Sequence, residues 1–331
     1  MPTVTVNGGA QFESDVSSPI LDAAARSNIT LPYSCKTGRC GVCKCKVVNG
    51  LTRPLRPESG LSEKEKAQGW ILSCVRVAET DLSLEVDDLE GIDLPAIKTV
   101  PCRIDQLERI AVDVLRVNLR LPPTTDFRFI PGQHIELIGV NGVRRSYSLA
   151  KANSSNKVIE LHIRAVHGGE LSQYWFSRAK INDLLRLNGP LGTFFLRDTV
   201  GLNIVFLATG TGIAPVKAML EFLAEKQIDQ RPMSITVLWG GRYFHDLYFN
   251  IEEIPGEFEF IPVLSRPEDK WRGARGYVQD VLLSLMPDLS NTVVYACGSN
   301  AMINSAKSTL FRAGLPENRF YADAFLSSGI N

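Results

Sequence analysis

The stretch "YSCKTGRCGVC", residues 33–43, carries three of the seven cysteines in a chain of 331 residues. Cys35, Cys40 and Cys43 have the spacing C-x4-C-x2-C, and the next cysteine that can join them is Cys74 in "GWILSCVRV". This is the ligand pattern of a plant-type [2Fe-2S] cluster. The four thiols are therefore the candidate metal ligands.

The fourth ligand and the nature of the site both have alternatives. Cys45 is a second candidate for the fourth ligand, but it starts the strand-like "KCKVV" only two residues after Cys43, where a small buried thiol is expected. A zinc site usually shows paired C-x2-C units. Inert core thiols would not gather in a loop that contains Gly38 and Gly41, which allow the backbone to wrap closely around a cluster.

The composition is that of an ordinary globular chain. Hydrophobic residues make up 44% of it, and 36 basic residues balance 36 acidic ones, so no overall field points to nucleic acid or to an anionic membrane. We find no secretory signal pattern and no apolar run long enough to span a bilayer. We expect a cytoplasmic protein, in which clustered cysteines bind metal or do chemistry.

Apolar periodicity predicts a multidomain chain of α+β and α/β class. Alternating and helical segments around the cysteine loop predict a ferredoxin domain with a β-grasp fold over residues 1–91, followed by a linker at 92–100. Period-two strands such as "VLRVNLRLP" and "VIELHIRAV" predict an antiparallel β-barrel over 101–198. Apolar strands that alternate with helices predict a parallel sheet over 199–331.

The loop after the first cysteine is rich in basic residues. They are either solvated side chains or a rim that receives an acidic partner protein. The residues concerned are Lys36, Arg39, Lys44, Lys46, Arg53 and Arg56.

The barrel segment contains "RRSYSLA", residues 144–150. Arg145-Ser146-Tyr147-Ser148 resembles the R-x-Y-S flavin signature of the ferredoxin–NADP reductase superfamily, and "PGQ" precedes it at 131–133. The resemblance implies a bound FAD. Arg145 would pair with the flavin pyrophosphate, Tyr147 would lie against the isoalloxazine, and Ser148 would hydrogen-bond near N5, where it would take part in catalysis.

Two further segments fit the same superfamily. "VHGGELS" places Gly169 and Ser172 at an expected strand-to-helix junction, where N–H groups and a hydroxyl can hold phosphate. In the superfamily, the G-x-x-S at this point binds the flavin diphosphate. "NGPLGTFFL", residues 188–196, resembles the turn that closes the flavin domain.

A glycine-rich turn opens the last domain. "LATGTGIAPVKAML" follows an apolar strand, and Gly210, Thr211 and Gly212 would let a dinucleotide approach the backbone, with Pro215 in the first helical turn. The turn lacks the third glycine of the usual dinucleotide fingerprint. It does match the G-T-G-x-A-P of the superfamily, which implies a nicotinamide nucleotide here.

The end of the chain supplies the remaining candidate residues. "YACGSNAMI" resembles the C-G motif of the superfamily, which implies that Cys297 faces the reactive end of the nicotinamide, with Gly298 leaving room for its ring. Phe325 in "FYADAF" corresponds to an aromatic residue that covers the flavin in related reductases. Ser265-Arg266 resembles the pair that grips the 2'-phosphate of NADPH. We nevertheless expect NADH by family, with NADPH as the alternative.

The three signals together predict an NAD(P)H-dependent oxidoreductase. Electrons would run from the nicotinamide through FAD and the [2Fe-2S] cluster to an external electron-acceptor protein. Similar reductases serve either a deoxysugar dehydrase or a component of a multicomponent oxygenase, and the resemblance to the first group is closer. A redox sensor without steady turnover is a third hypothesis.

Overall fold

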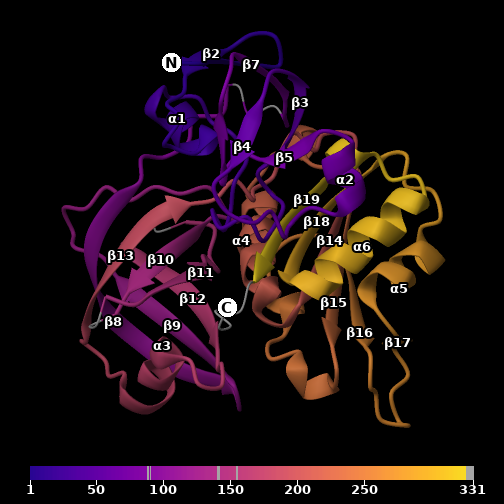
Figure 1. The fold of residues 1–331 in the computed structure, drawn as a ribbon. Coiled ribbons are helices and arrows are strands. Elements are labelled where there is room, and N and C mark those ends of the chain that lie inside the picture. The colour runs from indigo at the N-terminus through magenta and orange to yellow at the C-terminus, as the bar shows by residue number, and fades with distance from the viewer. Residues whose placement is uncertain (88, 90, 140–141, 154–155, 326–331) are drawn as a thin grey trace. The chain divides into compact units, whose positions relative to one another are not determined.

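The computed structural model describes residues 1–87, 89, 91–139, 142–153 and 156–325. They form two compact units, Met1–Asp93 and Leu94–Asn331, and the second unit contains two β-sheets (Figure 1). None of the helices in the described ranges combines the length and the apolar character needed to cross a membrane.

The first unit is built on a mixed five-stranded sheet in the order β2-β1-β7-β3-β5, in which β1 and β7 are parallel. A two-stranded sheet, β4-β6, stands beside it. The elements are β1 (Thr3–Val6), β2 (Gln11–Glu13), α1 (Ile20–Arg26), β3 (Lys44–Asn49), β4 (Thr52–Pro54), α2 (Glu63–Ala67), β5 (Trp70–Leu72), β6 (Arg76–Ala78) and β7 (Leu82–Glu85).

One helix and one face of the mixed sheet form the core of this unit. Ile20, Leu21 and Ala24 of α1 are buried at the spacing of one helical face. They pack with alternate residues of β1 and β7, such as Val4 and Leu84. The predicted ferredoxin fold is confirmed.

The second unit begins with a six-stranded antiparallel sheet in the order β11-β10-β13-β8-β9-β12. An antiparallel bridge between Leu149 and Leu161 joins its two edges, so the sheet closes into the predicted barrel. Its elements are β8 (Lys98–Ala111), β9 (Val114–Arg120), β10 (His134–Ile138), β11 (Arg144–Ser148), β12 (Val158–Arg164), α3 (Glu170–Gln173), a π-helical turn (Tyr174–Arg178) and β13 (Leu184–Leu191).

The first strand of the barrel begins within the predicted linker. The expected linker extends to residue 100, whereas β8 begins at Lys98. The reason is strand pairing, because Lys98–Val100 lie in register with Leu187–Gly189 of β13. The predicted domain limits stay predictions.

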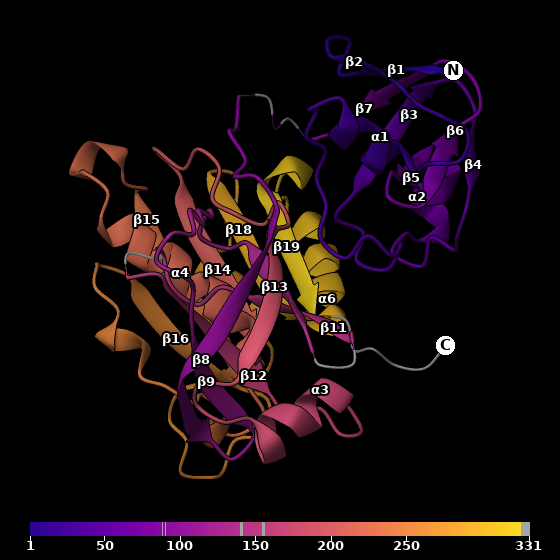
Figure 2. The same ribbon diagram turned by 90° about the vertical axis from the view of Figure 1, so that its left-hand side faces the viewer.

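The rest of the second unit is a six-stranded parallel sheet in the order β17-β16-β15-β14-β18-β19. Figure 1 shows α4 on one face of this sheet and α5 and α6 on the other, and Figure 2 shows α4 and α6 on opposite sides of it. The elements are β14 (Asn203–Thr209), α4 (Ile213–Ala224), β15 (Ser234–Gly241), β16 (Glu259–Leu264), β17 (Ala274–Arg275), α5 (Val278–Leu285), β18 (Thr292–Ser299), α6 (Asn300–Arg312) and β19 (Phe320–Phe325).

The strand order of the parallel sheet reverses between β14 and β18. From β14 the chain moves outward to β15, β16 and β17, and it then returns to β18 on the other side of β14. A reversal of this kind separates the loops at the carboxyl ends of the two central strands and leaves a crevice where ligands bind in open α/β sheets. Thr209 ends β14, and Ser299 ends β18.

Candidate functional site

The structure brings the four predicted cluster cysteines together as two pairs. Cys35 is hydrogen-bonded to Cys40, and the Cys43 thiol donates to the sulfur of Cys74 over 3.1 Å. Within the described ranges, no three His, Cys, Asp or Glu side chains are grouped to hold a single metal ion. Thiol pairs fit a dinuclear centre instead, because each iron of a [2Fe-2S] cluster takes two protein ligands.

One thiol of each pair is favoured as a thiolate. Hydrogen bonds from Cys40 and from Thr37 lower the pKa of Cys35 to about 4, against the opposing effect of burial. The hydrogen bond from Cys43 lowers the pKa of Cys74. Since the thiolate is the form that binds metal, these contacts prepare the loop for iron.

The loop leaves no room for a side chain at either of its two glycine positions. Gly38 and Gly41 both have a φ of +76°. A Cβ added at Gly38 would lie 2.5 Å from the carbonyl oxygen of Pro57, and one added at Gly41 would lie 2.9 Å from that of Gly60. The conformation that gathers the cysteines therefore depends on glycine at both positions.

The surroundings of Cys45 differ from those of the two thiol pairs. It sits in β3 with no exposed surface and is part of the hydrophobic core of the first unit. Burial raises the pKa of its thiol to about 12, whereas Cys43 is hydrogen-bonded to the sulfur of Cys74. The geometry favours Cys74 over Cys45 as the partner of Cys43.

The basic residues of this loop are partly neutralised by the fold. Lys36 lies 3.7 Å from a carboxylate oxygen of Asp22. Lys44 pairs with Glu65 at 3.2 Å, and Arg53 pairs with Glu79 at 3.2 Å. The field around the cysteine loop is therefore weaker than the count of basic residues suggests.

The flavin motif lies on β11. Side chains alternate along a strand, so Arg145 and Tyr147 share one face while Ser146 and Ser148 share the other. Trp175 Nε1 donates to the Tyr147 hydroxyl over 3.2 Å, and the two rings meet edge to face. Burial raises the pKa of Tyr147 to about 12, so the ring carries no charge near neutral pH. A neutral aromatic face suits a flat ring system.

Gly169 and Ser172 lie where the sequence predicts a junction. Gly169 directly precedes α3, and the Ser172 hydroxyl accepts a hydrogen bond from the Val166 N–H at 2.8 Å. This bond closes the turn between β12 and α3. Ser172 thus fixes the backbone that presents Gly169.

The two turns at the reversal of the parallel sheet touch each other. The Gly210–Gly212 turn links β14 to α4, whose first turn contains Pro215. A Cβ added at Gly212 would lie 2.1 Å from the carbonyl oxygen of Cys297. Gly298 has a φ of +145°, and a Cβ there would lie 2.2 Å from Thr209 Oγ1. Only glycines allow this contact, which brings Thr211 and Cys297 to the same edge.

Cys297 and Phe325 belong to this edge as well. Cys297 is buried at the end of β18, and burial raises the pKa of its thiol well above the ordinary value, so it stays protonated. Phe325 ends β19 opposite Ser299, and its side chain is 37% exposed. An exposed aromatic residue at this position is available to a planar ligand.

Arg164 is a residue that the motifs do not single out. It ends β12, with Nε 3.1 Å from a carboxylate oxygen of Asp113. Its Nη1 lies 2.7 Å from the point that a Cβ of Gly210 would occupy. Nη2 is buried and has no hydrogen-bond partner among the described residues. A partly exposed guanidinium whose buried Nη2 has N–H groups to spare, next to this turn, suits a diphosphate. In the sequence, Arg164 is recognisable as a charged residue at the end of a strand in which apolar and polar residues alternate.

Ser265 and Arg266 follow β16 at the same edge of the sheet. The Ser265 N–H donates to the carbonyl oxygen of Gly241 over 2.9 Å, and the Arg266 N–H donates to that of Arg242 over 2.8 Å. Both side chains are exposed. Positions 241 and 242 carry no acidic residue, but the carboxylate of Asp246 lies beside them, where it accepts hydrogen bonds from the N–H groups of Arg242 at 2.8 Å and of Tyr243 at 3.1 Å.

Known protein families match three successive parts of the chain. A 2Fe-2S iron-sulfur cluster binding domain matches residues 4–79, an oxidoreductase FAD-binding domain matches 101–196, and an oxidoreductase NAD-binding domain matches 206–308. The CDP-6-deoxy-L-threo-D-glycero-4-hexulose-3-dehydrase reductase of Yersinia pestis is 43% identical over 97% of both chains. The chain belongs to this family of iron-sulfur flavoprotein reductases. The reductase is thus an NAD(P)H-dependent FAD oxidoreductase with domains for all three redox groups.

More distant relatives of the reductase serve other systems. The xylene/toluene monooxygenase electron transfer component of Pseudomonas putida is 32% identical over 98% of this chain and 93% of its own. An Amycolatopsis cytochrome P450 reductase has the same fold, with a TM-score of 0.75 at 28% identity over 98% of this chain and 99% of its own. Relatives of the reductase therefore include electron-transfer components for dehydrase and oxygenase partners.

Proposed function

We propose that this reductase takes electrons from NADH and delivers them singly to a deoxysugar dehydrase. When bound, the flavin would receive electrons in pairs, and the cluster would pass them on one at a time. The observation that carries the proposal is the similarity to the Yersinia reductase over almost the whole of both chains. We expect this to take place in the cytoplasm.

The residues of this chain have separate tasks in that scheme. Cys35 and Cys40 would hold one iron, and Cys43 and Cys74 the other, as their pairing suggests. In the barrel, a guanidinium fork matches phosphate oxygens, so Arg145 would bind the flavin diphosphate together with the turn of Gly169 and Ser172. Tyr147 would flank the isoalloxazine, and Ser148 would donate a hydrogen bond near N5. Ser146, on the same strand, would also contact the cofactor.

The nucleotide would bind across the two touching turns. Backbone N–H groups of Gly210–Gly212, at the start of the helix that contains Pro215, would hold its diphosphate. Arg164 would add a cation from the barrel side, which would satisfy its unpartnered Nη2. Cys297 and Gly298 would flank the nicotinamide, and Phe325 would cover the flavin face until the nucleotide displaces it.

An oxygenase component is the second candidate for the electron acceptor. The similarity to the Pseudomonas putida component and to the Amycolatopsis cytochrome P450 reductase supports it. The dehydrase remains the first choice because its reductase shares 43% of residues, against 32% for the monooxygenase component.

Steady-state assays with both acceptors test the proposal. NADH oxidation is measured with a purified CDP-6-deoxyhexulose 3-dehydrase and its substrate, and in parallel with a purified oxygenase component and its substrate. We expect the dehydrase to give the faster turnover. Turnover with the oxygenase component but not with the dehydrase would make the oxygenase component the electron acceptor. Turnover with neither, and with no artificial acceptor either, would favour a redox sensor.

The choice of nucleotide gives a separate prediction. We expect a higher kcat/KM for NADH than for NADPH, and we expect Arg266→Ala to lower the value for NADPH by about 10-fold, because the 2'-phosphate would lose a charged partner. The value for NADH should change by less than about twofold. Equal losses for both nucleotides would mean that Arg266 does not read the 2'-phosphate.

A further inference from the structure

Two polar side chains in the middle of β12, Glu160 and His162, share one face of the strand and are shielded from water. Glu160 and His162 have side-chain exposures of 13% and 1%. The intervening Leu161 and Ile163 point into the barrel core. In an antiparallel barrel the polar face of a strand normally turns to solvent. Here it faces the nucleotide-binding half of the same unit.

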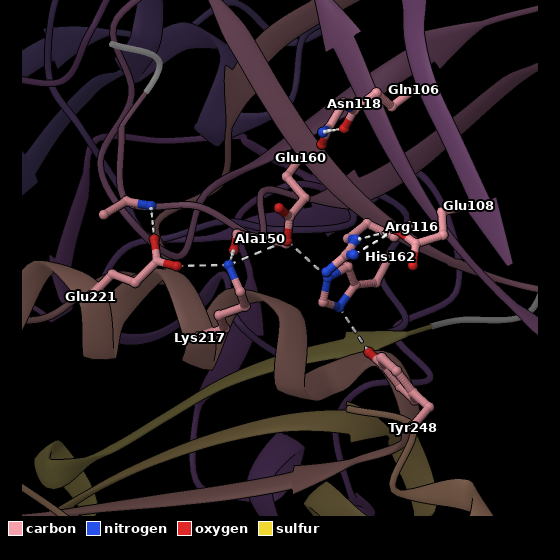
Figure 3. A network of polar contacts seen from close by, with 11 residues as sticks. Gln106, Glu108, Arg116, Asn118, Ala150, Glu160, His162, Lys217, Glu221 and Tyr248 are labelled. Carbon is pink, nitrogen blue, oxygen red and sulfur yellow. Dashed lines mark hydrogen bonds and ion pairs between the residues drawn. The ribbon is translucent and has the colours of Figure 1, made fainter. Parts of the chain in front are cut away.

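The polar face of β12 belongs to a continuous network (Figure 3). His162 Nε2 lies 3.0 Å from Glu160 Oε1, and His162 Nδ1 lies 2.9 Å from the Tyr248 hydroxyl. Lys217 Nζ lies 3.2 Å from the same Glu160 oxygen and 2.6 Å from Glu221 Oε1. Glu160 and His162 come from the barrel, whereas Lys217, Glu221 and Tyr248 come from the nucleotide-binding half.

The protonation of the network follows from its contacts. Burial would raise the pKa of Glu160, but the hydrogen bond from His162 and the charge of Lys217 lower it to about 2. An ionised Glu160 can only accept, so His162 donates from Nε2 and accepts from the Tyr248 hydroxyl at Nδ1. Burial lowers the pKa of His162, so the ring is neutral. Every member thus has a defined donor or acceptor role.

One end of the network holds the chain just after the flavin motif. Lys217 Nζ donates to the carbonyl oxygen of Ala150 over 2.9 Å, and the Ala152 N–H donates to Glu221 Oε2 over 2.9 Å. Ala150 lies two residues after Ser148. Lys217 and Glu221 lie one turn apart on α4, the helix that starts at the Gly210–Gly212 turn.

The other end of the network reaches the nucleotide turn itself. The Tyr248 ring meets Trp239 edge to face, with centroids 5.1 Å apart. Trp239 Nε1 donates to the carbonyl oxygen of Gly210 over 3.1 Å. The contacts therefore run without a break from the segment after the flavin motif to the turn that we assign to the nucleotide.

We infer that the network of Glu160, His162, Lys217, Glu221 and Tyr248 positions the flavin motif against the Gly210–Gly212 turn. These are positioning residues, since they act through Ala150, Trp239 and the two backbones. The inference rests on the proposed function, in which these two segments hold the flavin and the nucleotide. Hydride transfer depends steeply on such placement, because a displacement of about 1 Å can lower a rate on the order of 100-fold.

A neutral buried His162 predicts a pH dependence of stability. Its pKa is lower in the folded chain than the ordinary value of 6.5, so below that value the unfolded chain binds a proton that the folded chain does not. The groups that face it are Glu160, Tyr248, Lys217 and Arg116. Above pH 6.5 the contribution of the neutral ring is complete, and it is lost as the pH falls toward the folded-state pKa.

Urea unfolding of the wild type and of His162→Phe between about pH 7.5 and 5.5 measures this effect. The unfolding constant of the wild type should rise relative to that of the variant, by up to about tenfold per pH unit below 6.5. A stability difference that does not change with pH would show that the ring is not held neutral.

Two substitutions test the positioning role in the full-length protein with flavin bound. Tyr248→Phe removes one hydroxyl, and Lys217→Met removes the cation between two carboxylates. Tyr174→Phe is the matched control, because the Tyr174 hydroxyl also makes a short hydrogen bond, 2.8 Å to Asp183, but wholly within the barrel. Rapid mixing with NADH gives the limiting rate of flavin bleaching and the half-saturating NADH concentration. Amide hydrogen exchange without nucleotide gives a readout that is independent of activity.

We expect Lys217→Met to lower the limiting rate on the order of 10-fold and Tyr248→Phe about threefold, with half-saturation changed less than about twofold. Exchange at Ala152 should be about tenfold faster in Lys217→Met. Tyr174→Phe should change neither readout. Folded variants that keep the wild-type rates of flavin bleaching and of amide hydrogen exchange would overturn the inference. If Lys217→Met does not fold, Tyr248→Phe alone tests the inference. If NADH does not bleach the flavin of the wild-type protein, the result would overturn the proposed function instead.

Discussion

Replacing Cys74 by alanine is expected to abolish the absorbance of the iron-sulfur cluster. Cys74 is the partner of Cys43, with the two sulfurs 3.1 Å apart, so its loss would leave one iron with a single protein ligand. Flavin content and NADH-dependent reduction of ferricyanide should remain within about twofold of the wild type, since the flavin motif and the nucleotide turns lie in the other compact unit. Turnover with the protein acceptor should fall at least about 100-fold.

Cys45→Ala provides the control for Cys74→Ala. Cys45 is a fully buried cysteine of the same unit, so its loss should lower the free energy of unfolding by about 1–2 kcal/mol and leave the cluster in place. Iron and sulfide analysis, together with visible spectra, distinguishes the two variants. A cluster that survives in Cys74→Ala and disappears in Cys45→Ala would reverse the ligand assignment.

Replacing Arg145 by alanine is expected to release the flavin. A charge-assisted hydrogen bond to a phosphate contributes about 1.5–3 kcal/mol, so the Kd for FAD should rise about 10- to 100-fold. Flavin per chain after gel filtration and the recovery of activity on adding FAD measure this effect. The cluster spectrum should not change.

Arg144→Ala is the matched control for Arg145→Ala. Arg144 is the preceding residue of β11 and pairs at 2.7 Å with Glu136 on the neighbouring strand, on the opposite face from Arg145. Its loss should leave flavin retention within about twofold of the wild type. Stoichiometric FAD in Arg145→Ala, or equal losses in both variants, would remove Arg145 from the flavin site.

The fold could be predicted from the sequence because its signals are local. The cysteine spacing around Cys40 needs only a short loop, and the step from period-two strands to apolar strands with helices marks the start of the parallel sheet. The Gly210–Gly212 turn was recognisable because glycine is required where Gly212 and Gly298 meet the backbone of the facing turn. A requirement of this kind fixes the residue type at a single position, so it can be recognised in the sequence.

The network around His162 could not be predicted in this way. Alternation along β12 shows which side chains share a face, but it does not show what covers that face. The sequence therefore gives no sign that Glu160 and His162 are covered. The same limit applies to the cysteine loop, where the ion pairs of Lys36 and Lys44 join residues that are far apart in the sequence.

Anaerobic titration of the purified protein with NADH tests the central claim, that paired electrons enter from a nicotinamide and leave singly through iron. Flavin and a [2Fe-2S] cluster in one chain accept about three electrons, so about 1.5 equivalents of NADH should bleach both chromophores. Full bleaching of the flavin after about one equivalent without any change in cluster absorbance, or a protein without iron and inorganic sulfide, would contradict the account.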